Sequence, residues 1–150
     1  MTNKPISPKQ YIRTRARNLP LDTCYINHNW KENRMASIFV VRKHSNHNFT
    51  FGIYLVDLLA LGTKDTFYHF NVNESVLNEL LERSEPENWM KVSYPLVHNI
   101  IYGANDFAEY NGFKLHGDFE LTQHILEMDT DEVEYIEIEF GKNGEPFLLL

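Results

Sequence analysis

Three residues around one turn, Asp57, Lys64 and Asp65, have types that could support metal-dependent hydrolysis. Metal-dependent nucleases place carboxylates and a lysine around a metal ion, which activates water and stabilises the developing charge. The order Lys64-Asp65 is not diagnostic of such a site, and no second strand motif accompanies it. The alternative is structural: we expect a fold-determining turn in which local partners neutralise Asp57.

His98, His116 and Asp118 form a second candidate set, which would support metal binding or general-base catalysis. The three converge only if the connection at 116–118 folds back along a helix that begins near His98. The structural alternative gives His98 a hydrogen bond and makes Asp118 a helix N-cap. No two of the seven histidines have HExxH spacing, and no cysteine pair exists, so we predict no metal and no cofactor.

Asp57 is the single charge in the apolar run at 52–61, GIYLVDLLAL. Burying an unpaired carboxylate costs more free energy than a typical core contact returns. We therefore expect Asp57 to accept backbone N–H groups of the turn that follows, or to pair with Lys64.

The net charge of −7 hides a marked division along the chain. Residues 1–20 hold five basic residues and no acid, whereas residues 105–150 hold twelve acids and two lysines. Lys9, Arg13 and Arg17 recur at every fourth position and form a basic stripe, for which we expect an acidic counterpart. The division indicates either an intramolecular clasp or two faces for different partners. An acidic chain excludes broad coating of nucleic acid but leaves a local phosphate contact open.

The pattern of apolar residues, caps and turns predicts an α+β domain with a largely antiparallel sheet and N-terminal, central and C-terminal helices. The expected helices are at 8–18, after Asn73 and ending at 84–88, at 95–110, and from Asp118 to about 127. The expected strands are at 23–26, at 37–44, and from Phe49 onward. Periodicity does not decide whether 56–61 stays extended or turns helical.

Asn143-Gly144 is the preferred dipeptide of a type I′ turn and predicts that the domain closes in a C-terminal β-hairpin. The turn sets the register of the two strands. The expected pairs are Lys142 with Glu145, Phe140 with Phe147, and Ile138 with Leu149.

The length of 150 residues suits one domain, 1–150, whose first 20 residues form a basic arm and helix. A hydrophobic content of 43% excludes disorder. The chain lacks a run of about 18 apolar residues and the apolar core of a signal peptide, so we expect a cytoplasmic protein without membrane association. The lone Cys24 fits that compartment, and no residue that would activate it as a nucleophile can be assigned.

Several segments together are specific enough to mark a family. They are LPL at 19–21, the strand at 35–44, YLVDLLALGTKDTF at 54–67, HNIIYGANDFAEYNGFKLHGDF at 98–119, and the acidic strand before Phe140-Gly141. Through them the chain resembles, over nearly its whole length, an uncharacterised bacterial protein family. The resemblance implies no activity, ligand or catalytic residue. Relatives often carry Cys in place of Ala60 and Val in place of Thr63, so no mechanism that needs a thiol at position 60 is expected here.

We therefore expect a non-catalytic binding or adaptor protein that docks on a macromolecule, either a protein or an RNA phosphate backbone. Lys9, Arg13 and Arg17, or the acidic C-terminal region, would make the contact. The alternative is a metal-dependent hydrolase or nuclease, which needs at least three candidate side chains within about 5 Å of one point. A third possibility is a subunit completed by another chain, which predicts a cluster of exposed aromatic residues. The aromatic residues in question are Trp30, Trp89 and Tyr102.

Overall fold

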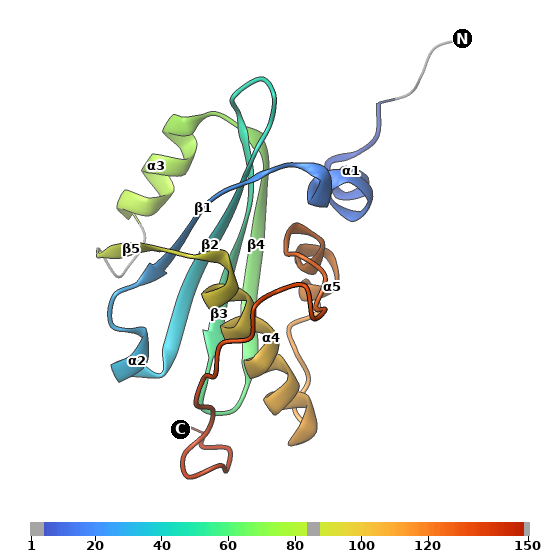
Figure 1. Cartoon of the computed structure of the whole chain (residues 1–150). Coiled ribbons are helices and arrows are strands. Elements are labelled where there is room, and N and C mark those ends of the chain that lie inside the picture. Colours follow the sequence, from blue (N-terminus) through green and yellow to red (C-terminus); the bar gives the residue numbers. More distant parts are fainter. Residues whose placement is uncertain (1–4, 84–87, 149–150) are drawn as a thin grey trace.

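One antiparallel sheet forms the centre of the molecule, with helices packed on both of its faces (Figure 1). The computed structural model describes residues 5–83 and 88–148. The helices are α1 (Pro8–Arg15), η1 (Ala16–Asn18), α2 (Trp30–Asn33), α3 (Glu74–Arg83), α4 (Tyr94–Tyr110), α5 (Phe119–Thr122) and η2 (Gln123–Ile125). The strands are β1 (Leu21–Asn27), β2 (Met35–Lys43), β3 (Phe49–Asp57), β4 (Gly62–Val72) and β5 (Trp89–Val92).

The strands lie in the order β4-β3-β2-β1-β5, and each neighbouring pair is antiparallel. The predicted hairpin at 37–57 is confirmed, since β2 and β3 pair from Lys43 with Phe49 to Met35 with Asp57. β3 ends at Asp57, so the segment after it forms a turn, and the chain returns as β4, a strand that the sequence patterns did not reveal. The α+β class with an antiparallel sheet is confirmed.

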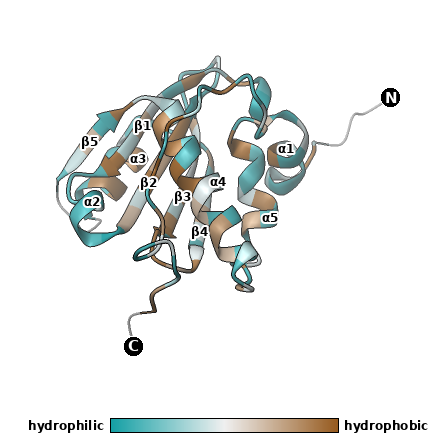
Figure 2. Cartoon of the chain, turned by 60° about the horizontal axis from the view of Figure 1, so that its bottom comes forward, coloured by the Kyte–Doolittle hydropathy of each residue, from teal (hydrophilic) through white to brown (hydrophobic). Residues whose placement is uncertain are grey.

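Both faces of the sheet are buried because alternate strand residues pack on different helices. Val40, Tyr54 and Val56 belong to the larger core, which includes Ile100 of α4. Phe39, Val41 and Phe51 belong to a second core, closed by Leu77 of α3. Figure 2 shows hydrophobic residues along the strands between the two layers of helices. This double burial explains why 37–43 and 49–57 read as nearly continuous apolar runs.

Local signals fixed two of the predicted helices, at 8–18 and 95–110. Ser7 Oγ accepts the Gln10 N–H at 3.1 Å, and Pro8 opens α1, which η1 extends to Asn18 as expected. α4 covers the predicted 95–110 and ends where Gly112 adopts a φ of +85°. The predicted stop of α3 at 84–88 falls mostly outside the described residues.

The predicted helix from Asp118 to about 127 is wrong in its form. α5 and η2 are short and end at Ile125, and the Asp118 side chain makes no capping hydrogen bond. Asp118 has φ −71° and ψ −10°, which is helical geometry, whereas a capping side chain needs an extended backbone at that residue.

The C-terminal hairpin is reduced to its turn. Asn143 and Gly144 both have positive φ, and Lys142 and Glu145 form the expected bridge. Within the described part of the chain, no ladder extends this bridge to Phe140 and Phe147. Leu149 lies outside the described residues. The arms bond instead to the β3–β4 turn, with Gly141 N–H donating to Leu58 O at 2.8 Å and Phe147 N–H to Leu59 O at 3.0 Å. Outside the Lys142–Glu145 bridge, these N–H groups of the two arms therefore donate to carbonyl groups of the β3–β4 turn and not to each other.

The three aromatic residues proposed to cluster on the surface do not do so. Trp30 is buried in the larger core, at 5% exposure. Trp89 packs edge-on against Phe39, and Tyr102 packs against His98. Within residues 5–83 and 88–148, no helix is both long and apolar enough to cross a membrane.

Candidate functional site

Asp57 is a structural residue of the β3–β4 turn. Its Oδ1 accepts the Leu59 N–H at 3.0 Å and its Oδ2 accepts the Leu61 N–H at 3.1 Å. The expectation that backbone donors of the turn neutralise this buried carboxylate is confirmed. Lys64 is exposed and forms no ion pair with Asp57 among the described residues. The carboxylate stabilises the turn because each of its oxygens accepts a charge-assisted hydrogen bond from a backbone N–H of the turn.

Asp65, His116 and Asp118 lie together, although the sequence had placed them in different sets. Asp65 Oδ1 is 3.7 Å from His116 Nε2, and Asp118 Oδ2 is 3.9 Å from His116 Nδ1. The two carboxylates therefore lie at opposite nitrogens of the ring and cannot share a metal ion with it. Among the described residues, no three His, Cys, Asp or Glu side chains have an arrangement that would hold a metal ion.

His98 is buried and takes part in a different group, a chain of hydrogen bonds that joins Tyr94 to the exposed Asp129. The Tyr94 hydroxyl lies 2.7 Å from His98 Nδ1, and His98 Nε2 lies 3.0 Å from Asp129 Oδ1. Tyr94 also accepts the Glu127 N–H at 2.7 Å. Burial raises the pKa of Tyr94, so its hydroxyl stays protonated and is not a nucleophile. The chain fixes the segment after η2 onto α4.

Two of the three residues in the basic stripe, Arg13 and Arg17, make contacts with other residues of the chain. Arg17 Nε donates to Leu126 O at 2.8 Å, and Arg17 Nη2 donates to Gln123 O at 3.2 Å. Arg13 pairs with Glu120 at 2.8 Å. Lys9 stays exposed on α1. The expected acidic counterpart is thus real for Arg13, while Arg17 binds the carbonyl end of a helix, where a cation is favoured.

Arg42 is the buried charge that the sequence interpretation missed. It is 1% exposed on β2. It donates to Ile125 O at 2.6 Å and Leu19 O at 2.7 Å, and its Nη2 pairs with Glu127 Oε1 at 3.0 Å. A cation inside the apolar strand SIFVVRKH was the signal that could have revealed it, because a buried guanidinium needs several acceptors.

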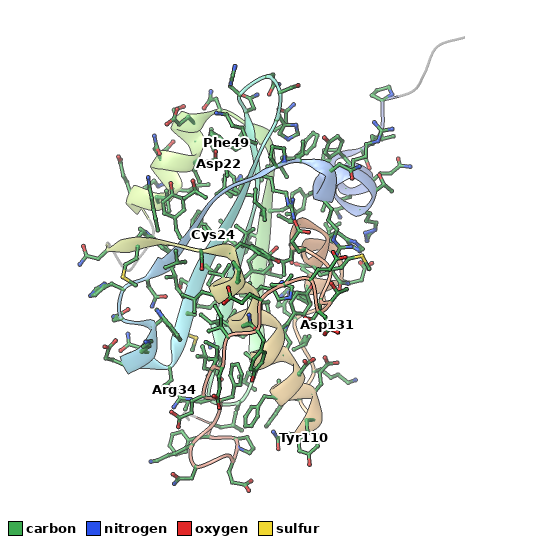
Figure 3. The ribbon with its side chains drawn as sticks, viewed as in Figure 1. Asp22, Cys24, Arg34, Phe49, Tyr110 and Asp131 are labelled. Atoms are coloured by element: carbon green, nitrogen blue, oxygen red, sulfur yellow. The ribbon has the colours of Figure 1, made fainter. Side chains whose placement is uncertain are left out.

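Residues 128–139, here called the acidic ribbon, make bends and a turn up to residue 133 and then run without regular secondary structure over α4 (Figure 1). Asn99 Nδ2 donates to Glu134 O at 2.9 Å, and Arg34 Nη2 donates to Glu139 O at 2.9 Å and Gly141 O at 3.0 Å. Arg34 and Asp131, which belong to the two ends of this arrangement, are labelled in Figure 3. The exposed acids of the ribbon are Asp129, Asp131, Glu132, Glu134, Glu137 and Glu139. Asn99 and Arg34 therefore hold the backbone of the ribbon in place, while its carboxylates face solvent.

A groove of about 490 Å³ lies between the second half of α4 and residues 115–123. We call it the acidic groove, because its lining includes the carboxylates of Asp106, Glu109, Glu120 and Asp129 beside Tyr102 and Asn105. Glu120 is paired with Arg13 and Asp129 with His98. Within 5–83 and 88–148, Asp106 and Glu109 form no ion pair. Burial, followed by the charges of Asp129 and Glu109, raises the pKa of Asp106.

Asn105 lines this groove and is 2% exposed. Its Oδ1 accepts the N–H of Thr63 at 2.8 Å and the hydroxyl of Thr63 at 2.9 Å. Its buried Nδ2 has no hydrogen-bond partner within the described part of the chain. Gly62, with φ +64°, permits this approach, because a Cβ there would lie 2.8 Å from Asn105 Oδ1. The amide is thus fixed in orientation, and its N–H₂ group is left unsatisfied.

Cys24 is buried in the larger core. Burial raises the pKa of its thiol to about 12. A thiol with such a pKa is protonated at neutral pH and cannot act as a nucleophile.

No family model, curated protein or solved structure matches this chain. A five-stranded antiparallel sheet with helices on both faces does not by itself assign an activity.

Proposed function

We propose that this protein is a non-catalytic binding module whose acidic C-terminal region holds a basic segment of a partner protein. The supporting observation is the acidic ribbon, which presents exposed carboxylates on a backbone that Arg34 and Asn99 fix to the fold. A charged surface of one sign attracts a partner of the opposite sign and sets the rate of association.

Preorganisation makes this surface suited to binding. Ordering a flexible segment on association costs about 0.5–1.5 kcal/mol for each immobilised side chain, and a segment ordered beforehand avoids part of that cost. The His98–Asp129 hydrogen bond holds the start of the ribbon on α4. Arg42 pairs with Glu127, the residue just before the ribbon. Basic residues inside the fold thus position acidic residues outside it.

The sign of the surface favours a basic protein segment over nucleic acid, since phosphate would be repelled by the ribbon. The exposed Lys9 and Arg15 of α1 offer a second contact, suited to acidic groups of the same partner. Metal-dependent hydrolysis draws no support from the described residues, because Asp65 and Asp118 lie on opposite sides of the His116 ring.

Selection from a displayed library of random peptides at low salt tests the proposal. We expect enrichment of Lys-rich and Arg-rich peptides on the wild-type protein, and its loss on the triple variant Asp131→Asn, Glu134→Gln, Glu137→Gln. The matched control, Asp22→Asn, Glu74→Gln, Glu82→Gln, changes net charge equally on β1 and α3 and should retain the enrichment. Enrichment that survives in the ribbon variant, or that favours acidic peptides, would contradict the proposal.

A further inference from the structure

Part of the outer edge of the sheet is open along β4, which lies at one end of the strand order (Figure 1). The start of this edge is closed, because Thr63 N–H donates to Asn105 Oδ1 at 2.8 Å and Thr63 O accepts the His116 N–H at 3.1 Å. Further along, Tyr68 and Phe70 make no backbone hydrogen bond within 5–83 and 88–148 outside the pairing of β4 with β3. These two residues mark the open part of the edge.

The pairing of β3 with β2 decides which residues of β3 bond to β4. The β2–β3 ladder continues past its ends, with His44 N–H donating to Asn48 O at 2.8 Å and Leu58 N–H donating to Arg34 O at 3.0 Å. Backbone bonds in an antiparallel pair involve every second residue, so the even-numbered residues of β3 bond to β2. The odd-numbered residues of β3 therefore bond to β4.

The same alternation decides which backbone groups of β4 face outward. Phe67 and His69 pair with Ile53 and Phe51, two odd-numbered residues of β3, and so bond toward the sheet. Tyr68 lies between them and presents its N–H and C=O groups to the outer side.

Two further groups, the Thr66 carbonyl and the Phe70 N–H, face outward with Tyr68, since they lie two positions from it along the strand. The Thr66 N–H is already satisfied by Asp65 Oδ1 at 3.0 Å. The open edge thus offers donors and acceptors in the spacing that an added strand requires.

A groove of about 230 Å³ adjoins this part of β4. Its lining includes Thr66, Phe67 and Tyr68, three consecutive residues of the strand, with Leu121 and Thr122 of α5 on the other side. Consecutive side chains of a strand point to opposite faces of the sheet, so a groove lined by all three follows the strand backbone. There is therefore space beside the unpaired backbone groups.

We propose that the outer edge of β4 binds an extended segment of a partner protein, which adds a strand to the sheet through backbone hydrogen bonds to Thr66, Tyr68 and Phe70. One side chain of the segment enters the groove between β4 and α5, and an acidic side chain lies beside Lys9. This surface is separate from the acidic ribbon, so the inference goes beyond the proposed function and does not depend on it.

The composition of the open edge supports strand addition. Residues 66–70, TFYHF, contain no Asp, Glu, Lys, Arg or Pro, the residues that commonly keep an edge strand from pairing with another chain. Phe67 is 52% exposed and presents apolar surface that a neighbouring strand would cover. The opposite edge is different, since β5 has four residues and includes Lys91. The sheet thus protects one edge and leaves the other open.

The charges at the groove favour a partner of different sequence over a second copy of this chain. Lys9 lines the groove, is exposed, and forms no ion pair in the described part of the chain. Asp118, the other charged residue of the lining, lies 3.9 Å from His116. Lys9 therefore attracts an acidic side chain, and a second copy paired through residues 66–70 brings none to it.

Amide hydrogen exchange of the full-length protein, followed by NMR, tests the open edge and its occupant together. The probe is a short blocked peptide of alternating valine and threonine with one glutamate at its end. In the free protein, the amides of Tyr68 and Phe70 should exchange faster than those of Phe67 and His69, which bond to β3. The peptide should slow exchange at Tyr68 and Phe70 at least about fivefold and leave the other two nearly unchanged. Slow exchange of all four amides in the free protein would overturn the inference.

Methylation of the peptide backbone distinguishes strand addition from side-chain contact. Two versions of the probe have N-methyl groups at alternate residues, one at the odd positions and one at the even positions. Only one set of amides faces β4, so one version should lose affinity at least about tenfold while the other stays within about threefold of the parent. Equal affinities of the two versions, or no binding of the parent peptide, would overturn the inference.

A charge exchange tests the position of the acidic side chain. Lys9→Glu should weaken binding of the probe roughly fivefold, and replacing the glutamate of the probe by lysine should restore it. Lys91→Glu, on the opposite edge of the sheet, is the matched control and should bind the original probe as the wild type does. Protection of Tyr68 and Phe70 that rises with protein concentration, without any peptide, would show a second copy at this edge and would overturn the assignment to a partner.

Discussion

Arg42 and Glu127 join the centre of the sheet to the start of the acidic ribbon, with 3.0 Å between Nη2 and Oε1. Arg42 is 1% exposed, while the side chain of Glu127 is 41% exposed. The pair therefore links a buried cation to a carboxylate at the surface. Together with the Arg42 hydrogen bonds to Leu19 O and Ile125 O, it ties the N-terminal and C-terminal segments to β2.

The first prediction concerns this buried cation. Arg42→Met keeps the apolar stem but leaves the carbonyls of Leu19 and Ile125 without donors, and we expect a loss of about 3 kcal/mol or more in the free energy of unfolding. Urea denaturation followed by circular dichroism measures it. Arg83→Met, which removes an exposed pair with Glu79 on α3, is the control and should cost less than about 0.5 kcal/mol. Equal losses in the two variants would contradict the structural role of Arg42.

The second prediction separates the residues of the basic stripe. Arg17→Gln removes the donors to Leu126 O and Gln123 O, and we expect a loss of about 1–2 kcal/mol in unfolding free energy. Lys9→Gln, on the exposed side of α1, should stay within about 0.5 kcal/mol of the wild type. Thermal or urea unfolding of both variants checks this. A stripe devoted wholly to a partner would instead leave both variants as stable as the wild type.

The third prediction concerns the pH dependence of Asp106. Burial and the neighbouring Asp129 and Glu109 raise its pKa in the folded protein, so ionisation destabilises the fold as the pH rises through that pKa. Asp106→Asn should therefore gain stability at neutral pH, by less than about 0.5 kcal/mol because solvent screens the group. The gain should vanish at a pH well below the ordinary value of 3.8, where both proteins carry a neutral group. Melting temperatures across this pH range test the sign, and a gain that is largest in acid would refute it.

The fourth prediction concerns Cys24. Because its thiol is buried and its pKa is raised to about 12, we expect negligible reaction with Ellman's reagent in the folded protein near pH 8. Reaction should become stoichiometric in urea. Rapid labelling of the folded protein would mean that the core opens around β1 far more readily than its burial implies.

Residues with local causes were predictable from sequence. Asp57 had to find donors because it lies in an apolar run, and the turn after it supplies them within four residues. Ser7 and Pro8 start α1 through contacts inside one helical turn. In both cases the partner is close in sequence, so composition and spacing contain the necessary information.

Residues with distant partners were not predictable by the same means. Arg42 finds Glu127 across 85 residues, and His98 finds Asp129 across 31. The reasoning applied to Asp57 would have indicated that Arg42 needs acceptors, but not which ones. The prediction of a C-terminal hairpin failed for a related reason. Its arms donate hydrogen bonds to Leu58 and Leu59, which are distant in sequence, and the Asn143-Gly144 turn signal gives no information about those acceptors.

The most direct test of the acidic surface is a titration of a fluorescently labelled peptide of alternating lysine and glycine, followed by anisotropy at several salt concentrations. We predict saturable binding by the wild type that weakens steadily from about 0.05 to 0.5 M salt, as expected for exposed charges. The Asp131→Asn, Glu134→Gln, Glu137→Gln variant should bind at least about fivefold more weakly at low salt. Binding of equal strength by that variant and the wild type, or binding that salt does not affect, would contradict the proposed function.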